Sequence, residues 1–146
     1  MNEFTIVTVV GRPVAEVFAV SQDVTKMPMW NPGMSEARIE GGGPLEPGAT
    51  LAFRSTFLGR TYDSQAVCTV LIEDKQIATK STGGPFYLET DTTLEPVDGG
   101  TRVTSNYRGE SRGFFKLAEP LVVRLTRRQS QTAAENLKAL LEEDAL

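Results

Sequence analysis

Histidine is absent from this chain of 146 residues, and cysteine occurs once, as Cys68. Without histidine there is no Ser-His-Asp or Cys-His catalytic arrangement, no His-ligated metal site and no imidazole to act as a general base near neutral pH. A single cysteine forms neither an internal disulfide nor a thiolate metal cluster. We therefore expect no metal and no cofactor, and the sequence identifies no catalytic residue.

Positively charged residues are fewer than negatively charged ones. The chain has 15 Lys and Arg residues and 19 Asp and Glu residues, so its formal net charge is −4. Nucleic-acid binding draws most of its affinity from neutralised phosphates, so we expect no nucleic-acid partner. No stretch approaches the roughly 18 consecutive apolar residues of a membrane span. The first ten residues contain Glu3 and lack the basic region of a signal peptide. These features favour a cytoplasmic protein without stable membrane insertion and leave its oligomeric state open.

The spacing of apolar residues predicts the first elements of the chain. Residues 4–10 alternate in a way that suits a strand covered on both faces. A short helix begins at Val14, behind Pro13 at a first-turn position. A second, weaker helix covers about residues 24–29 and ends before Pro32.

The remaining chain divides into a region of period two and a terminal helix. Residues 34–110 alternate between apolar and polar side chains and are broken by turn residues, which predicts six strands joined by hairpins. Together with residues 4–10 and a length typical of one domain, this predicts a single domain over residues 1–146. After Arg112 a helix of about 28 residues is expected. Its apolar positions are Leu117, Leu121, Leu125, Ala133, Leu137, Leu140 and Leu141.

The four hairpin turns predict which side chains share a face of the sheet, because pairing outward from each turn sets the register. The turns at Leu58-Gly59, Asp74-Lys75, Gly84-Pro85 and residues 97–100 agree on one apolar face. On the opposite face the same registers bring unlike charges together, such as Arg54 with Asp63. The predicted pairs on the apolar face include Phe57 with Arg60, Ser55 with Tyr62, Cys68 with Ser81, Val70 with Thr79, Thr79 with Thr90, and Thr90 with Tyr107.

Hydroxyl groups are unusually frequent on this otherwise apolar face. Thr79, Thr90 and Tyr107 lie side by side across three predicted strands, and further hydroxyls flank them. An unpaired buried hydroxyl costs about 1 to 3 kcal/mol, so six of them in a dry core would be costly. A cavity that holds water or a ligand removes this cost. The alternative is that threonine is common in strands and bonds locally.

Several short motifs, spread over essentially the whole chain, resemble the START/Bet v 1-like (SRPBCC) superfamily. Within it the chain is similar to the polyketide cyclase/dehydrase and lipid transport branch. The resemblance implies an α+β helix-grip fold, in which a curved seven-stranded antiparallel sheet and two short helices after strand 1 wrap around a long C-terminal helix. It also implies a deep pocket between sheet and helix. The motifs are residues 13–18, residues 29–33, Gly48, residues 93–96 with 99–103, and residues 136–142.

The candidates for contact with a ligand come from the covered face, the terminal helix and the second short helix. Tyr107 is the best polar candidate, because a phenol donates a hydrogen bond while its ring packs. Trp30 is either a pocket residue or an aromatic that anchors the second helix, and Gln129 faces either the cavity or solvent. Cys68 is expected to act as a small hydrophobe. The full set is Trp30, Phe53, Phe57, Tyr62, Cys68, Thr79, Ser81, Thr90, Thr92, Tyr107, Leu121, Leu125 and Gln129.

Three functions fit these observations. The first is binding, sequestration or transport of a small hydrophobic ligand of the lipid, polyketide or aromatic type, held by apolar burial and oriented by hydroxyls. The second is an enzyme of the polyketide cyclase, aromatase or dehydratase type acting in the same cavity. The third is an interaction module with a filled core. A basic cluster of Lys116, Arg124, Arg127 and Arg128 indicates either a solvated helix face or contact with an acidic partner or anionic lipid.

Overall fold

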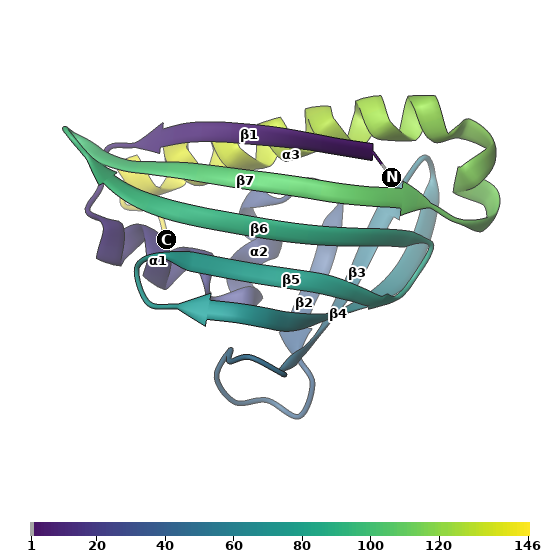
Figure 1. Cartoon of the computed structure of the whole chain (residues 1–146), viewed down its shortest axis with the longest axis horizontal. Coiled ribbons are helices and arrows are strands. Elements are labelled where there is room, and N and C mark those ends of the chain that lie inside the picture. The colour runs from purple at the N-terminus through teal and green to yellow at the C-terminus, as the bar shows by residue number, and fades with distance from the viewer. Residues whose placement is uncertain (1) are drawn as a thin grey trace.

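The architecture is a single curved antiparallel sheet wrapped around a long C-terminal helix (Figure 1). The computed structural model describes residues 2–146, apart from the side chain of Phe114. In the sheet the strands follow the order β1-β7-β6-β5-β4-β3-β2. The predicted α+β helix-grip fold and the order of its elements are confirmed. The strands are β1 (Asn2–Val10), β2 (Met34–Ile39), β3 (Thr50–Phe57), β4 (Arg60–Ile72), β5 (Gln76–Gly83), β6 (Phe86–Val97) and β7 (Gly100–Ser111).

Two short helical segments after β1 close one end of the sheet (Figure 1). The helix α1 (Val14–Ser21) follows Pro13, whose fixed φ suits this position. A 3-10 turn η1 (Val24–Lys26) and the helix α2 (Met27–Trp30) form the second segment, and Asp23 caps it by accepting a hydrogen bond from the backbone N–H of Thr25 at 3.2 Å. Both predicted short helices are therefore present.

The edge strand β1 is covered on one face only, so the expectation of cover on both faces is wrong. Ile6 and Val10 are buried, whereas the side chains that alternate with them, Val7 and Val9, are 53% and 43% exposed. Val10 packs in a core cluster with Val17 of α1. The helices lie on the concave side of the sheet, and no helix within residues 2–146 covers its outer side at β1 (Figure 1).

Three of the four predicted hairpin registers are confirmed. Phe57 pairs with Arg60, Thr79 pairs with Thr90, and Thr90 pairs with Tyr107. The predicted charge pairs on the outer face also form, with 3.0 Å between Arg54 Nε and Asp63 Oδ1 and 2.7 Å between Arg102 Nη1 and Glu95 Oε1. The alternation of the sequence and its turn residues were therefore sufficient to place these strands.

The register between β4 and β5 differs from the prediction. Cys68 pairs with Thr79 instead of Ser81, and Val70 pairs with Ala78 instead of Thr79. The turn has three residues instead of two, with Asp74 at its centre in the left-handed region at φ 60°. A β-bulge between Cys68 and Val70 adds a second shift, and it reverses the alternation so that Leu71, not Ile72, packs against the core.

The terminal helix begins differently from the prediction. A 3-10 segment η2 (Gly113–Ala118) precedes the α-helix α3 (Glu119–Glu142), which starts with Pro120 in its first turn. A 3-10 segment has three residues per turn, so it shifts which side chains face inward. The predicted apolar position Leu117 lies in this segment and is 88% exposed. Leu121 is 46% exposed because positions spaced by four drift around an α-helix of 3.6 residues per turn, away from the side of Ala133 and Leu137.

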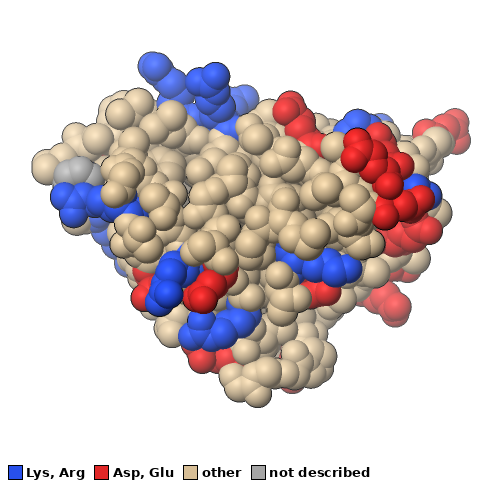
Figure 2. All heavy atoms as spheres, turned by 180° about the vertical axis from the view of Figure 1, so that it is seen from behind, with Lys and Arg blue, Asp and Glu red and all other residues tan. Residues whose placement is uncertain are grey.

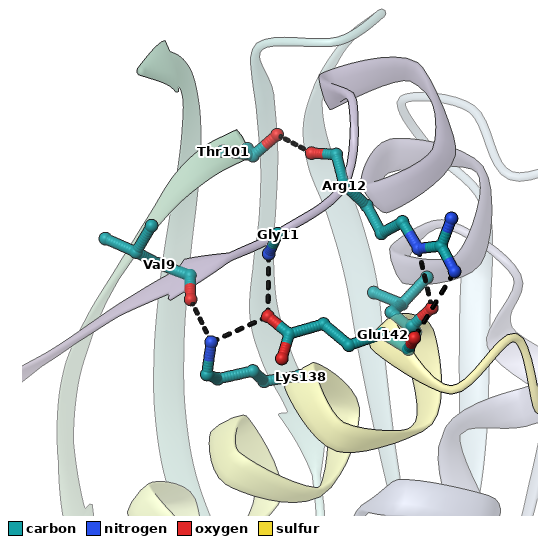
Figure 3. Close-up of polar contacts among 7 residues, drawn as sticks. Val9, Gly11, Arg12, Thr101, Lys138 and Glu142 are labelled. Carbon is teal, nitrogen blue, oxygen red and sulfur yellow. Dashed lines mark hydrogen bonds and ion pairs between the residues drawn. The ribbon is translucent and has the colours of Figure 1, made fainter. Parts of the chain in front are cut away.

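The C-terminal end of α3 is tied to the link between β1 and α1 by a network of polar contacts (Figure 3). Glu142 Oε2 accepts hydrogen bonds from the backbone N–H of Gly11 and from Lys138 Nζ, both at 2.7 Å. Arg12 Nε donates to the carbonyl of Leu141 at 3.0 Å, which places a cation at the negative end of the helix dipole. The buried hydroxyl of Thr101 donates to the Arg12 carbonyl at 2.8 Å. These contacts hold this end of the helix against the sheet.

Candidate ligand-binding cavity

A cavity of about 350 Å³ lies between the concave face of the sheet, α2 and α3. This volume falls within the range of about 300 to 1,000 Å³ that is typical of small-molecule sites. Most of the residues predicted from the sequence contribute to its wall. They are Trp30, Phe53, Phe57, Tyr62, Thr79, Ser81, Thr90, Thr92, Tyr107 and Gln129.

Cys68 does not line the cavity, which corrects its place among the candidates. The side chain is 1% exposed and packs in a separate core cluster with Val24, Leu45 and Leu51. Burial raises the pKa of the Cys68 thiol, and a hydrogen bond to the Val70 carbonyl opposes this only in part. The thiol stays protonated and acts as a small hydrophobe.

Leu121 and Leu125 also lie outside the cavity lining. Leu121 points to solvent, and Leu125 packs against a cluster of Phe57, Phe115 and Val122. Over the first half of α3 the inward side is shifted by one residue, to Val122 and Thr126, whereas the predicted Gln129, Ala133 and Leu137 do face the cavity. The residues of α3 in the wall are Val122, Val123, Thr126, Gln129, Ser130, Ala133, Ala134 and Leu137.

Thr126 and Ser130 were not predicted from the sequence, because the apolar periodicity of a helix does not include hydroxyl residues. Their spacing of four nevertheless places both on one side of the helix, in line with the buried Ala133 and Leu137. A search for small and hydroxyl residues at helical spacing would have found this stripe.

Aromatic rings form one region of the cavity wall. The Phe86 ring lies edge-on to the rings of Phe57 and Tyr62, with centroid distances of 5.5 and 5.4 Å. Phe115 of η2 packs behind them, 4.7 Å from the Phe86 centroid. Edge-to-face arrangements of this kind stabilise aromatic clusters and offer ring faces and edges to an apolar ligand.

The hydroxyls of the covered face bond to one another or to nearby backbone. Thr79 Oγ1 lies 2.6 Å from Thr90 Oγ1, and Thr92 Oγ1 lies 3.0 Å from Ser105 Oγ. Ser81 Oγ accepts from the Leu88 N–H at 3.0 Å. The local bonding that the sequence left open as an alternative therefore occurs, beside a cavity. Because each hydroxyl pair holds two O–H protons and its contact uses one, the second proton remains able to donate to a ligand.

Tyr107 combines ring packing with a buried hydroxyl. Its ring stacks on Phe4 of β1, with centroids 4.8 Å apart and an interplanar angle of 20°. Burial raises the pKa of Tyr107, and hydrogen bonds with Ser105 and Ser130 oppose that rise. The phenol is therefore neutral at physiological pH and serves as a hydrogen-bonding group rather than a base. Burial likewise raises the pKa of Tyr62.

Trp30 both lines the cavity and packs against the core cluster of Val17 and Leu137. Its carbonyl accepts a hydrogen bond from Asn136 Nδ2 at 3.1 Å, which ties α2 to α3. The indole Nε1 and the Ser21 hydroxyl are shielded from solvent and have no hydrogen-bond partner among the described residues. Both interpretations of Trp30 made from the sequence therefore apply.

Gln129 lies against the start of β2, where the chain approaches α3 closely. A Cβ atom on Gly33, which has φ +85°, would lie 2.9 Å from Gln129 Nε2 and 2.9 Å from the Thr56 carbonyl oxygen. Only glycine tolerates both this conformation and this approach. The side chain of Gln129 thus lies beside Gly33 and contributes an amide to the cavity wall.

The cavity wall carries almost no charge. Within residues 2–146, Glu110 is the one charged residue in the cavity wall, and Arg112 Nη2 lies 3.9 Å from it. Arg124, Arg127 and Arg128 are exposed on the outer side of α3. Basic side chains gather over the first half of this helix and acidic ones toward its C-terminal end (Figure 2).

A second, more open hollow adjoins the aromatic region. It measures about 430 Å³ and is lined by Arg60, Tyr62, Arg112 and Phe115, among others. Arg112 lies over the Tyr87 ring, with its Cζ 5.2 Å from the ring centroid. No cluster of metal-ligating side chains is found among the described residues. None of the helices within residues 2–146 combines the length and the apolar character needed to cross a membrane.

The fold of this chain is similar to that of several solved structures. The aromatase/cyclase ZhuI from Streptomyces sp. R1128 superposes with a TM-score of 0.78 at 12% identity, covering 99% of this chain and 96% of that one. A START superfamily protein from Mycobacterium smegmatis gives 0.77 at 18% identity, with 97% of both chains covered. Ara h 8.0201 gives 0.74 at 17% identity, with 96% of this chain and 97% of that chain covered. These similarities show the helix-grip fold.

The sequence then places the chain in a family. A profile for polyketide cyclase / dehydrase and lipid transport proteins matches residues 1–142, and the chain belongs to this family. No curated protein matches its sequence. The resemblance seen in the short motifs is thereby confirmed.

Proposed function

We propose that this protein binds a small hydrophobic molecule of the lipid, polyketide or aromatic type in the cavity between the sheet and α3, and sequesters or carries it. The observation that carries the proposal is the composition of the wall, in which the rings of Phe57, Tyr62 and Phe86 adjoin a row of hydroxyls. Apolar burial would supply the affinity, at about 25 cal/mol per Å², and the hydroxyls would orient the ligand.

Binding is favoured over catalysis because neither phenol of the cavity is suited to act as a general base. The phenols of Tyr62 and Tyr107 have raised pKa values and stay protonated near neutral pH. A general base needs a pKa near the working pH. An enzyme of the cyclase or aromatase type would have to act by holding a flexible substrate in a reactive conformation. The similarity to ZhuI keeps this as the second candidate.

Native mass spectrometry of the purified protein, followed by extraction and identification of bound molecules, tests the proposal. We expect a small apolar molecule at a stoichiometry near one. An empty protein that also fails to take up neutral fluorescent probes would contradict it and favour an interaction module with a filled core. Conversion of a bound polyketide-like substrate, lost in Tyr107→Phe, would favour the enzyme. The cytoplasmic location and the single domain stay predictions from the sequence.

A further inference from the structure

The wall of the cavity is polar without being positively charged, and this limits what it can hold. Of the described residues that line it, none is a lysine or an arginine, and the one acidic residue is Glu110. The polar groups are hydroxyls and amides, such as Thr79, Thr90, Tyr107 and Gln129. Such groups donate hydrogen bonds to neutral acceptors but do not balance a buried negative charge.

The helix α3 shows the same separation within one element. Its cations Arg124, Arg127 and Arg128 are exposed, whereas the side that faces the cavity carries Thr126, Gln129 and Ser130. The helix side of the molecule has a broad area without charged side chains, and charged groups lie around and below it (Figure 2). Arg60 and Arg112 line the adjoining open hollow instead, and Arg112 Nη2 lies 3.9 Å from Glu110 of the cavity wall. A carboxylate or sulfonate inside the cavity would therefore find no lysine or arginine among the described wall residues, and the nearby Arg112 already faces the carboxylate of Glu110.

We infer that the cavity selects uncharged ligands that carry hydrogen-bond acceptors, such as ketones, esters or alcohols, and rejects anions, including free fatty acids. The inference rests on the proposed function, since it assumes that the cavity binds a ligand. An unpaired ionised group loses several kcal/mol of hydration on burial, so it binds there only after it is neutralised. The cavity of about 350 Å³ also favours a compact molecule over a two-tailed phospholipid.

A matched pair of dyes measures this selectivity. N-phenylnaphthylamine is neutral, and anilinonaphthalenesulfonate has the same ring framework with one sulfonate added. Fluorescence titration of the wild-type protein is expected to show binding of the neutral dye with a Kd at least about tenfold lower than that of the sulfonate. Equal or tighter binding of the sulfonate would overturn the inference. Failure of both dyes to bind would instead contradict the proposed function.

The same contrast between a neutral and an anionic ligand is tested with two competitors that are not fluorescent. Decanol and decanoate have equal chain lengths, and at about pH 8 the acid is ionised. We expect decanol to displace bound N-phenylnaphthylamine and decanoate to displace it at least about tenfold less effectively. Displacement by both with equal potency would show that the cavity tolerates a carboxylate and would overturn the inference.

A pair of variants on α3 locates the selectivity in the cavity. Thr126→Arg introduces a cation into the wall, whereas Leu121→Arg adds the same charge at a position that faces solvent on the same helix. We expect Thr126→Arg to strengthen binding of the sulfonate dye about tenfold and Leu121→Arg to leave it unchanged. An equal gain in Leu121→Arg, or no gain in Thr126→Arg, would contradict the claim that the missing cation excludes anions.

Discussion

The side-chain oxygens of Thr79 and Thr90 lie 2.6 Å apart across neighbouring strands, on the face of the sheet that lines the cavity. Their register was predicted from the Gly84-Pro85 turn, and the structure shows that the two hydroxyls contact each other. The pair therefore stabilises the sheet and presents a polar spot to the cavity at the same time.

Replacing one member of this pair is expected to cost more than replacing both. Thr79→Val or Thr90→Val leaves a buried hydroxyl without its partner, which lowers the free energy of unfolding by about 1 to 2 kcal/mol. The double variant removes both hydroxyls and is expected within about 0.5 kcal/mol of the wild type. Urea unfolding of the four proteins measures this. Additive losses in the double variant would show that the contact is not a hydrogen bond between the two side chains.

Tyr107→Phe is expected to remove one hydrogen-bond donor from the cavity while keeping the ring that stacks on Phe4. The neutral naphthyl ketone prodan reports this directly, because its emission shifts to the blue when its carbonyl loses a hydrogen bond. We expect a blue shift and an affinity loss of about two- to tenfold, equivalent to one neutral hydrogen bond. N-phenylnaphthylamine has no carbonyl and provides the control, since its affinity should change less than about twofold. An unchanged prodan spectrum would place its carbonyl elsewhere in the cavity.

The polar contacts of Glu142 at the C-terminal end of α3 predict that the protein becomes less stable in acid. A hydrogen bond from Lys138, and a second from the Gly11 N–H, lower the pKa of Glu142 below its ordinary value of 4.5. A carboxyl whose pKa is lower in the folded state contributes stability above its unfolded pKa, and this is lost as the pH falls through the folded value. Glu142→Gln should therefore unfold at lower urea concentration than the wild type at neutral pH, and the difference should shrink below about pH 4. A difference that is constant with pH would show that the charge of Glu142 does not matter.

Ser21→Ala is expected to raise stability. The Ser21 hydroxyl is shielded from solvent without a hydrogen-bond partner among the described residues, so its removal should increase the free energy of unfolding by about 0.5 to 1 kcal/mol. Ser130→Ala is the matched control, because the Ser130 hydroxyl bonds to Tyr107 and its loss should destabilise the protein. Thermal or urea unfolding measures the stability of both variants relative to the wild type. A destabilised Ser21→Ala would show that this hydroxyl has a partner, such as a bound water.

Much of the candidate site was predictable because strands obey a simple geometric rule. Alternation and turn chemistry placed Phe53, Tyr62, Thr90 and Tyr107 on one face, and all four line the cavity. The rule failed where the chain departs from regular geometry, at the three-residue turn around Asp74 and at the bulge beside Cys68. A bulge depends on how a strand pairs with its neighbour, which local sequence does not express.

The sequence by itself determined the absence of imidazole chemistry, the seven-stranded sheet and the gathering of hydroxyls on its covered face. Tertiary structure decided which side of α3 lines the cavity. Leu121 and Leu125 fall outside the cavity while Thr126 and Ser130 line it, because residues four apart drift around an α-helix of 3.6 residues per turn and packing against the sheet fixes the side that faces inward. Helix phase and the pairing of hydroxyls depend on contacts between residues far apart in the chain, and these exist only once the sheet has closed around the helix.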